Sequence, residues 1–374
     1  MLHSTATQTE RVILAGVDTG EDRGLFQIEM DELKALAHAA GGRVVARAVQ
    51  RRPAVDPATM LGLGKVEETA QLAREHDAQL VVTLNALRPR QRSALEKMFG
   101  EVAVMDRSVL ILDIFARHAR TSEGKLQVEL AQLRHRAANL IGARDALSRL
   151  GGGIGTRGPG ETKLEVDRRR IRLRISHLEG QLELVRKRRV EQRRSREGTP
   201  VVALVGYTNA GKSSLLNALS GADVLVADQP FATLDPTLRK AYLEPGQAAI
   251  LADTVGFISD LPKELVAAFR ATLEEVTNAT LLVHVIDASN PYWQRQRASV
   301  NVVLRELGAA DKPVVYVWNK IDAAPYAGSA ADLDLGVLGV LVSAKTGAGI
   351  PELKSAIAER LRSLAASPPA SSIS

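Results

Sequence analysis

Short apolar runs alternate with stretches of helical periodicity along the N-terminal part of the chain. Four runs have the length and composition of buried strands, at 11–17, 44–49, 80–84 and 102–105. Three segments between them have the spacing of amphipathic helices, at 31–40, 65–76 and 90–99. Strands that alternate with helices are typical of a parallel sheet with helices packed on it. We therefore predict an N-terminal parallel α/β domain over residues 1–115.

The apolar pattern changes between residues 116 and 197, where the spacing becomes that of packed helices. Apolar residues step by four and three from Leu126 to Leu140, and by seven from Leu164 to Val185. A glycine-rich segment, 151–160, separates the two series. This pattern predicts an antiparallel helical hairpin whose second helix covers 162–195. A kink or break is expected at Gly180, because glycine costs about 1 kcal/mol relative to alanine inside a helix.

A third region begins after Gly198 and Pro200, where apolar strands again alternate with helices. It predicts a second α/β domain over 198–362 that ends in a helix at 351–363. The last residues, 363–374, are dominated by Ala, Ser and Pro and predict a disordered tail.

Composition and charge narrow the class of protein. The 374 residues include 49 Lys and Arg, 43 Asp and Glu, and no Cys, which excludes disulfides and thiolate metal sites. No apolar stretch approaches the roughly 18–20 residues of a membrane span, and the N-terminus lacks a secretory signal. We therefore predict a cytoplasmic protein, of which a fraction is peripherally associated with a membrane. Residues 117–197 hold 21 basic and 10 acidic side chains, so this region is either a solvated helical face or a nucleic-acid footprint.

The pattern G-x-x-x-x-G-K-S follows the apolar strand 201–205 and precedes a helix. Its glycines allow turns that aim consecutive backbone N–H groups at phosphate oxygens, and the helix N-terminus adds positive charge. Lys212 supplies a charge for the β- and γ-phosphates, and Ser213 a hydroxyl for Mg²⁺. The candidate nucleotide-binding residues of this phosphate loop are Gly206, Tyr207, Thr208, Asn209, Ala210, Gly211, Lys212, Ser213 and Ser214.

Three further motifs follow in order, each at the end of an apolar strand. The first is D-x-x-G, whose carboxylate can hold the metal ion and whose glycine N–H can contact the γ-phosphate. In the second, N-K-x-D, the carboxylate of Asp322 can accept two hydrogen bonds that guanine donates and adenine does not. The third motif, S-A-K, can present backbone N–H groups to guanine O6. Together with the phosphate loop, the three motifs predict a site for GTP/GDP rather than for ATP. The residues are Asp253 and Gly256, then Asn319, Lys320 and Asp322, then Ser343, Ala344 and Lys345.

The segments 228–240 and 253–265 are candidate switch loops that respond to the γ-phosphate. Thr233 is the expected second Mg²⁺ ligand, with Thr237 as the rival, and Phe231 beside it is a candidate nucleotide contact. The candidate catalytic residues are Lys212, Thr233 and Gly256. The candidate metal ligands are Ser213, Thr233 and Asp253.

Phe257 stands where many Ras-like GTPases have a Gln that orients the attacking water. A phenyl ring cannot hydrogen-bond water, so we expect slow intrinsic hydrolysis that a partner, another side chain or a cation accelerates. Asn209 is a candidate ligand for an activating K⁺, and an Asn that only orders the loop is the alternative.

Two weaker signals lie outside this site. Residues 61–65 precede a helix and resemble a second phosphate loop, but a helix-capping turn is favoured because the segment lacks the G-K-S/T ending. His118 and His135 have no paired metal-ligand spacing and are expected on the surface.

The stretch 152–165, followed by Asp167, Arg168 and Arg169, resembles the signature of the HflX family of GTPases in the Obg-HflX superfamily. Residues 231–237, 253–258 and 260–272 resemble the switch regions of that family. The resemblance implies a Ras-like P-loop GTPase domain in a factor that binds the large ribosomal subunit and its RNA. It also implies that the GTP-bound factor separates stalled ribosomes under stress. The expected RNA contacts are Arg157, Arg168, Arg169 and Arg170, and a monomer is expected.

Two other functions stay open at this point. One is a GTPase of ribosome assembly or tRNA modification, similar to the Obg or MnmE groups, with other RNA partners. The other is an RNA-binding scaffold whose nucleotide only stabilises the fold, which predicts no stimulated turnover.

Overall fold

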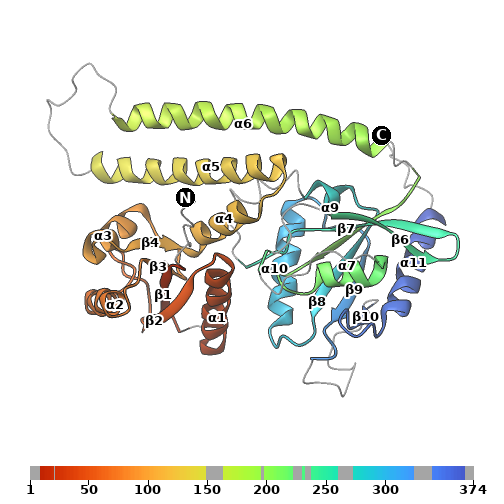
Figure 1. The fold of residues 1–374 in the computed structure, drawn as a ribbon, viewed down its shortest axis with the longest axis horizontal. Helices are drawn as coiled ribbons and strands as arrows, with labels where there is room; N and C mark the ends of the chain where they lie inside the picture. Colours follow the sequence, from red (N-terminus) through yellow and green to blue (C-terminus); the bar gives the residue numbers. More distant parts are fainter. Residues whose placement is uncertain are drawn as a thin grey trace, which may run out of the picture. The chain divides into compact units, whose positions relative to one another are not determined.

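The structure is a computed structural model that describes residues 9–20, 22–148, 163–194, 198–221, 230–231, 237–259, 273–323 and 339–366. The chain divides into two compact units (Figure 1). The first contains the chain up to Arg117 together with Lys125–Leu182. The second contains His118–Gly124 and the chain from Glu183 onward. The domain boundaries drawn from the sequence at 116, 198 and 363 stay predictions.

The first unit is built on a four-stranded parallel sheet with the strand order β2-β1-β3-β4. The predicted parallel α/β fold of the N-terminal region is therefore confirmed. The strands are β1 (Arg11–Asp18), β2 (Arg43–Arg51), β3 (Leu80–Thr83) and β4 (Ala103–Asp106). The helices that follow them in turn are α1 (Arg23–Ala39), α2 (Leu63–Glu75), α3 (Pro89–Phe99) and α4 (Arg107–His118).

Both faces of this sheet are buried, as the apolar strands require. On one face, Ile13 and Val17 of β1 join a core with Val66 of α2 and Leu95 of α3. On the other face, α1 approaches β1 so closely that a Cβ at Gly16 would lie 3.1 Å from Met30 and Phe26 side-chain atoms. Glycine at this position therefore allows the helix to pack directly on the strand.

Two helices differ from the sequence expectation. Helix α1 begins at Arg23 rather than near residue 31, because the Asp22 carboxylate caps it by accepting the Gly24 and Leu25 N–H groups. Helix α4 was not expected, since its nearly continuous apolar run has no clear period. Its Leu110, Ile114 and Phe115 are buried, so burial of apolar side chains rather than a local periodic signal accounts for the helix.

The predicted helical hairpin is confirmed, with α5 at Ser122–Ser148 and α6 at Lys163–Arg194. The two helices run antiparallel (Figure 1), and two ion pairs join them within the first unit. The Arg174 guanidinium donates to both carboxylate oxygens of Glu129 at 2.7 and 3.0 Å, and Arg134 pairs with Glu179 at 2.7 Å. The glycine-rich tip 151–160, with Arg157, lies outside the described residues.

Helix α6 continues through Gly180 without interruption, so the expected kink or break is absent from this described helix. The hydrogen-bonded turns on either side of a single glycine are sufficient to keep the backbone helical. Residues 162 and 195, which the sequence assigned to the same helix, lie outside the described range.

The second unit contains a six-stranded sheet with the order β10-β9-β8-β5-β7-β6, parallel except for β6. The predicted Ras-like α/β architecture is confirmed here. Its strands are β5 (Val201–Gly206), β6 (Thr237–Glu244), β7 (Gln247–Asp253), β8 (Leu281–Asp287), β9 (Val314–Asn319) and β10 (Gly339–Leu341). Its helices are α7 (Lys212–Ser220), α9 (Glu274–Asn278), α10 (Trp293–Glu306) and α11 (Ile350–Ala366). Among the helices in the described segments, none combines the length and hydropathy that crossing a membrane requires.

Helices α7 and α11 pack on one face of this sheet, where Leu215 and Ile357 join Val283 of β8 in a common core. On the opposite face, Trp293 of α10 meets Trp318 of β9 edge to face at 4.6 Å between ring centroids. Two sequence boundaries need correction. Residues 237–240 of the candidate switch segment 228–240 belong to β6, where they pair with β7. Helix α11 extends to Ala366, so residues 363–366 of the expected tail are helical, because Ala365 and Ala366 favour helix.

Substituting Gly180 tests the continuity of α6. An added Cβ there would meet nothing within 4 Å, so Gly180→Ala should raise stability by about 1 kcal/mol through helix propensity alone. Thermal unfolding followed by circular dichroism gives the measurement. Gly42→Ala is the matched control, since its Cβ would lie 2.7 Å from Val12 Cγ2 and should lower the melting temperature. A lower melting temperature for Gly180→Ala would show that the helix requires glycine at this position.

Candidate functional site

The loop between β5 and α7 is shaped by residues that tolerate an unusual backbone. Asn209 and Gly211 have φ values of 59° and 91°, in the left-handed region. A Cβ at Gly206 would lie 2.3 Å from the Val285 carbonyl oxygen, and one at Gly211 would lie 2.3 Å from Asn319 Nδ2. Only glycine fits at these two positions, so the loop can wrap closely around a ligand at the N-terminus of α7.

Lys212 is buried at the first turn of α7, and its ammonium group is held over the loop. Its Nζ donates to the carbonyl oxygens of Gly206 at 3.1 Å and Tyr207 at 2.8 Å. Burial lowers the pKa of Lys212 to about 8, although the nearby Asp253 carboxylate opposes this shift. A cation with so few water contacts gains more from an arriving phosphate group than an exposed lysine does.

Ser213 and Asp253 bring two oxygen ligands together next to Lys212. The Ser213 hydroxyl donates to Asp253 Oδ2 at 2.6 Å, and Asp253 is buried at the end of β7. A hydroxyl beside a carboxylate is a donor set that suits Mg²⁺. In the described part of the chain, no group of three His, Cys, Asp or Glu side chains could hold a metal ion. Thr233 lies outside the described residues, and its rival Thr237 begins β6 opposite Asp253.

The D-x-x-G segment lies directly on the phosphate loop. The Phe257 N–H donates to the Gly206 carbonyl at 3.1 Å, and the Thr208 N–H donates to the Phe257 carbonyl at 2.6 Å. A Cβ at Gly256 would lie 2.7 Å from Thr208 Cα, so glycine is required for this approach. The Phe257 ring is buried, and it is therefore not placed to orient an attacking water.

Asn319 joins the phosphate loop to the predicted base-recognition loops. Its side chain is buried, and its Nδ2 donates to the Ala210 carbonyl at 2.9 Å. Its Oδ1 accepts the Ala344 N–H at 3.0 Å. The first contact fixes the distance between the phosphate end and the base end of the site. The second holds the Ser343–Lys345 segment beside β9.

Asp322 is exposed at the base end, with one carboxylate oxygen fixed. Its Oδ1 accepts a hydrogen bond from the Ser343 hydroxyl at 2.6 Å, which lowers the pKa of Asp322 below its ordinary value. The carboxylate is therefore ionised near neutral pH and remains a strong acceptor. Lys320 has a left-handed φ of 65° and pairs with Asp287 at 2.8 Å, which fixes the turn that presents Asp322.

Phe231 connects the phosphate loop to a segment that the sequence did not associate with it. The Phe231 N–H donates to Thr208 Oγ1 at 3.1 Å, and His118 Nδ1 lies 2.8 Å from the Phe231 carbonyl oxygen. His118 was expected on the surface, and its position in the nucleotide-binding unit was missed. No local signal indicates this contact, because the two residues are 113 positions apart.

Three of the predicted RNA contacts, Arg168, Arg169 and Arg170, lie on α6 in the first unit, whereas Arg157 lies outside the described residues. Arg168 is half-buried, whereas Arg169 and Arg170 are exposed. Arg170 also lines a cavity of about 680 Å³ between helices of the first unit, together with Arg92, Asp113 and Arg136. Burial raises the pKa of Asp113 above its ordinary value, although Arg117 and Arg136 oppose this shift.

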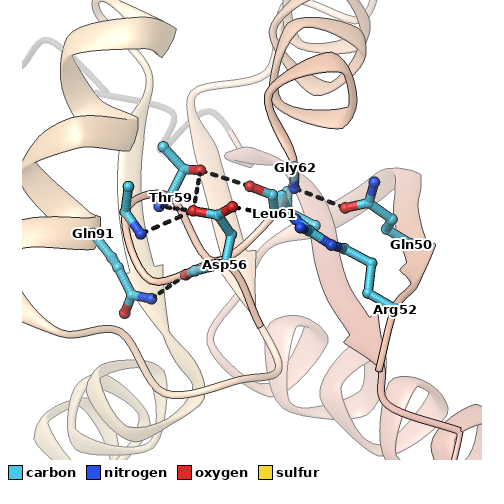
Figure 2. Close-up of polar contacts among 8 residues, drawn as sticks. Gln50, Arg52, Asp56, Thr59, Leu61, Gly62 and Gln91 are labelled. Atoms are coloured by element: carbon cyan, nitrogen blue, oxygen red, sulfur yellow. Dashed lines mark hydrogen bonds and ion pairs between the residues drawn. The ribbon is translucent and has the colours of Figure 1, made fainter. Parts of the chain in front are cut away.

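Figure 2 shows the polar contacts around the turn that precedes α2, where residues 61–65 begin. The Gly62 N–H at the start of α2 donates to Gln50 Oε1 at 2.8 Å. Asp56 Oδ1 accepts the Ala58 and Thr59 N–H groups, and Gln91 Nε2 donates to the Asp56 carbonyl at 2.7 Å. Lys65, outside the view, pairs with Glu68 at 2.7 Å. Polar groups of the surrounding residues therefore hold this turn in place, and the helix-capping interpretation of residues 61–65 stays a prediction.

Three family models match the chain in order. A model described as GTP-binding GTPase N-terminal matches residues 27–116, and one described as GTP-binding GTPase Middle Region matches 118–196. A model described as 50S ribosome-binding GTPase matches 201–320. Each of the two regions that precede the nucleotide site in the sequence therefore has its own match.

Several relatives named GTPase HflX are similar over nearly the whole chain. That of Lacrimispora saccharolytica is 49% identical over 354 residues, which cover 92% of this chain and 81% of the relative. That of Escherichia coli K12 is 46% identical over 356 residues, which cover 94% and 83%.

A solved GTP-binding protein from the archaeon Sulfolobus solfataricus, in complex with GDP, is similar in fold. It is 22% identical with a TM-score of 0.50, and the match covers 95% of this chain and 100% of that chain. At that identity, the likeness extends to the fold alone. The family models and relatives, together with the phosphate loop and the base-recognition loops, establish that this guanine-nucleotide-binding chain is a GTPase and belongs to the HflX family.

Proposed function

We propose that this GTPase binds the large ribosomal subunit in its GTP-bound state and separates stalled ribosomes under stress. The observation that carries the proposal is that the basic hairpin starts and ends in the unit that holds the nucleotide site. Residues 118–124, which include the start of α5, and the chain from Glu183 in α6 both belong to that unit. A family model described as ribosome-binding and relatives named HflX support the choice of partner. The proposed place of action is the cytoplasm.

The proposed reaction is attack of water on the γ-phosphate of GTP. Lys212 neutralises charge on the phosphate oxygens, and the Gly256 N–H donates to the γ-phosphate. Ser213 and Asp253 would hold Mg²⁺ together with Thr233, and the ion would supply further charge stabilisation. Ser214 and the phosphate-loop N–H groups bind the remaining oxygens. Asn209, exposed and in the left-handed region, is the candidate contact for K⁺.

The base end is proposed to select guanine through Asp322. Its Oδ2 and Oδ1 would accept from the N1–H and the exocyclic amine, which adenine does not offer in that arrangement. Ala344 and Lys345 would present backbone N–H groups to O6. Asn319 keeps this end in register with the phosphate loop, through its bond to Ala210.

Two contacts in the nucleotide-binding unit would carry the nucleotide state to the hairpin. His118 precedes α5 and contacts the backbone of Phe231 at the predicted first switch. Arg186 on α6 pairs with Glu274 at 3.0 Å, and Glu274 begins α9 shortly after the predicted second switch. A conformational change in either predicted switch segment would therefore displace one end of the hairpin. Switch segments whose order depends on the nucleotide act on neighbouring elements in this way.

The charge state of Lys212 should make nucleotide binding pH-dependent. Lys212 is charged below its pKa of about 8 and neutral above it, and phosphate binding requires the charged form. GDP affinity should therefore change little below about pH 7.5 and fall roughly tenfold between pH 7 and pH 9. Titration with a fluorescent GDP analogue measures this. Lys212→Met should bind weakly with a nearly flat profile, and the same slope in that variant would assign the effect to another group.

The exchange Asp322→Asn should change base preference. An amide replaces one acceptor with a donor, so GTP affinity should fall by at least about tenfold while xanthosine triphosphate affinity rises. Competition between the two nucleotides measures the ratio. Asp311→Asn, at an exposed position of the same unit, is the control. Unchanged base preference in Asp322→Asn would remove this residue from the guanine site.

Purified large ribosomal subunits should stimulate GTP turnover at fixed salt by tenfold or more, about 1.4 kcal/mol of the barrier. The reason is that Phe257 cannot orient the attacking water, so the subunit is proposed to complete the site. Arg157→Ala should weaken subunit binding without changing the affinity for free GTP. If the protein binds the subunit but GTP turnover is not stimulated, the result would support an RNA-binding scaffold whose nucleotide only stabilises the fold. Stimulation by precursor subunits or tRNA alone would favour an assembly or tRNA-modification GTPase.

A further inference from the structure

Tyr207 contacts the catalytic side of the phosphate loop with its backbone and the D-x-x-G segment with its side chain. Its carbonyl oxygen accepts the hydrogen bond from Lys212 Nζ at 2.8 Å. Its side chain is buried and extends to Ser259, three residues beyond Gly256. The Ser259 N–H donates to the Tyr207 hydroxyl oxygen at 2.9 Å, and the two hydroxyl oxygens lie 3.0 Å apart.

The hydroxyl groups continue into α10, and their proton order can be derived. The Ser299 hydroxyl lies 3.0 Å from the Arg295 carbonyl, which can only accept, so Ser299 donates there. Ser299 must then accept from Ser259, whose oxygen lies 3.2 Å away. Ser259 in turn accepts from Tyr207. The chain therefore runs in one direction, from Tyr207 through Ser259 and Ser299 to a helix carbonyl.

The row of hydrogen-bonded hydroxyl groups holds the segment Gly256–Ser259 at Ser259. Backbone hydrogen bonds hold the same segment near its middle, at Phe257. Phe257 exchanges its N–H and carbonyl with Gly206 and Thr208. Because Gly256 lies between Asp253 and these anchors, the position of its N–H depends on both. A shift of Ser259 away from Tyr207 would move the Gly256 N–H relative to Lys212.

We propose that Tyr207 is a positioning residue for GTP hydrolysis, which acts by fixing Gly256–Ser259 against the phosphate loop through its hydroxyl group. The Tyr207 side chain itself transfers no proton and no chemical group in the reaction. Since GDP has no γ-phosphate and its base is bound at Asn319–Lys345, the hydroxyl should matter little for GDP affinity. It should matter for the step in which the γ-phosphate is cleaved.

Tyr207→Phe tests this because it removes the hydroxyl and keeps the ring. In single-turnover assays of the full-length protein with saturating GTP, the cleavage rate should fall about tenfold, or about 1.4 kcal/mol. The dissociation constant for GDP should stay within about twofold. Tyr242→Phe is the matched control, because Tyr242 is 66% exposed on β6, and it should leave both quantities unchanged.

Ser259→Ala provides the second variant and separates positioning from general stability. Alone it should slow cleavage, and combined with Tyr207→Phe it should add less than about twofold, because the two hydroxyls form one chain. An unchanged cleavage rate in Tyr207→Phe would overturn the proposal. So would fully additive effects, or an equal loss of GDP affinity and cleavage rate with a lower melting temperature. None of these outcomes depends on ribosome binding, so the proposed partner is tested separately.

Discussion

The two hydrogen bonds of the buried Asn319 side chain hold the nucleotide site together. One reaches the Ala210 carbonyl in the phosphate loop, and the other reaches the Ala344 N–H in the base-recognition loop. The phosphate loop follows β5, whereas the base-recognition segments follow β9 and β10, so the Asn319 side chain joins parts of the site that are distant in the sequence. A buried amide with both ends satisfied is rigid, because breaking either bond leaves a polar group without water. Gly211 belongs to the same constraint, since any side chain there would displace the amide.

Burial of charge is the second constraint on the site. Lys212 is buried beside two carbonyl oxygens and near Asp253, and this arrangement replaces part of its lost hydration. Its pKa still falls, so the free protein holds a cation that is incompletely compensated. An incoming phosphate completes that compensation. The Lys212 charge therefore lowers the stability of the free loop and raises the affinity for nucleotide. Other contacts must hold the loop in its binding conformation before the nucleotide arrives.

The fold class and the locations of most elements could be predicted from the sequence, because their signals are local. The strand–loop–helix around Lys212 and the heptad spacing of α5 and α6 each lie within one stretch of chain. The structure brings the described phosphate-loop, D-x-x-G and base-loop residues together, while Thr233 and Arg157 stay predictions. Contacts between distant segments could not be predicted. His118 meets Phe231 and Tyr207 meets Ser259 only in the folded chain, across separations of 113 and 52 residues.

Some basic side chains of the hairpin form ion pairs between its two helices, and others are exposed to solvent. Arg134 and Arg174 pair with glutamates of the facing helix, at a spacing that joins α5 to α6. Such exposed pairs add about 1 kcal/mol or less each, so they set the alignment of the helices more than their stability. Arg169 and Arg170 remain exposed, and aromatic residues make up only 3% of the sequence. The proposed recognition of RNA by this hairpin would therefore rely on phosphate contacts and shape rather than on base stacking.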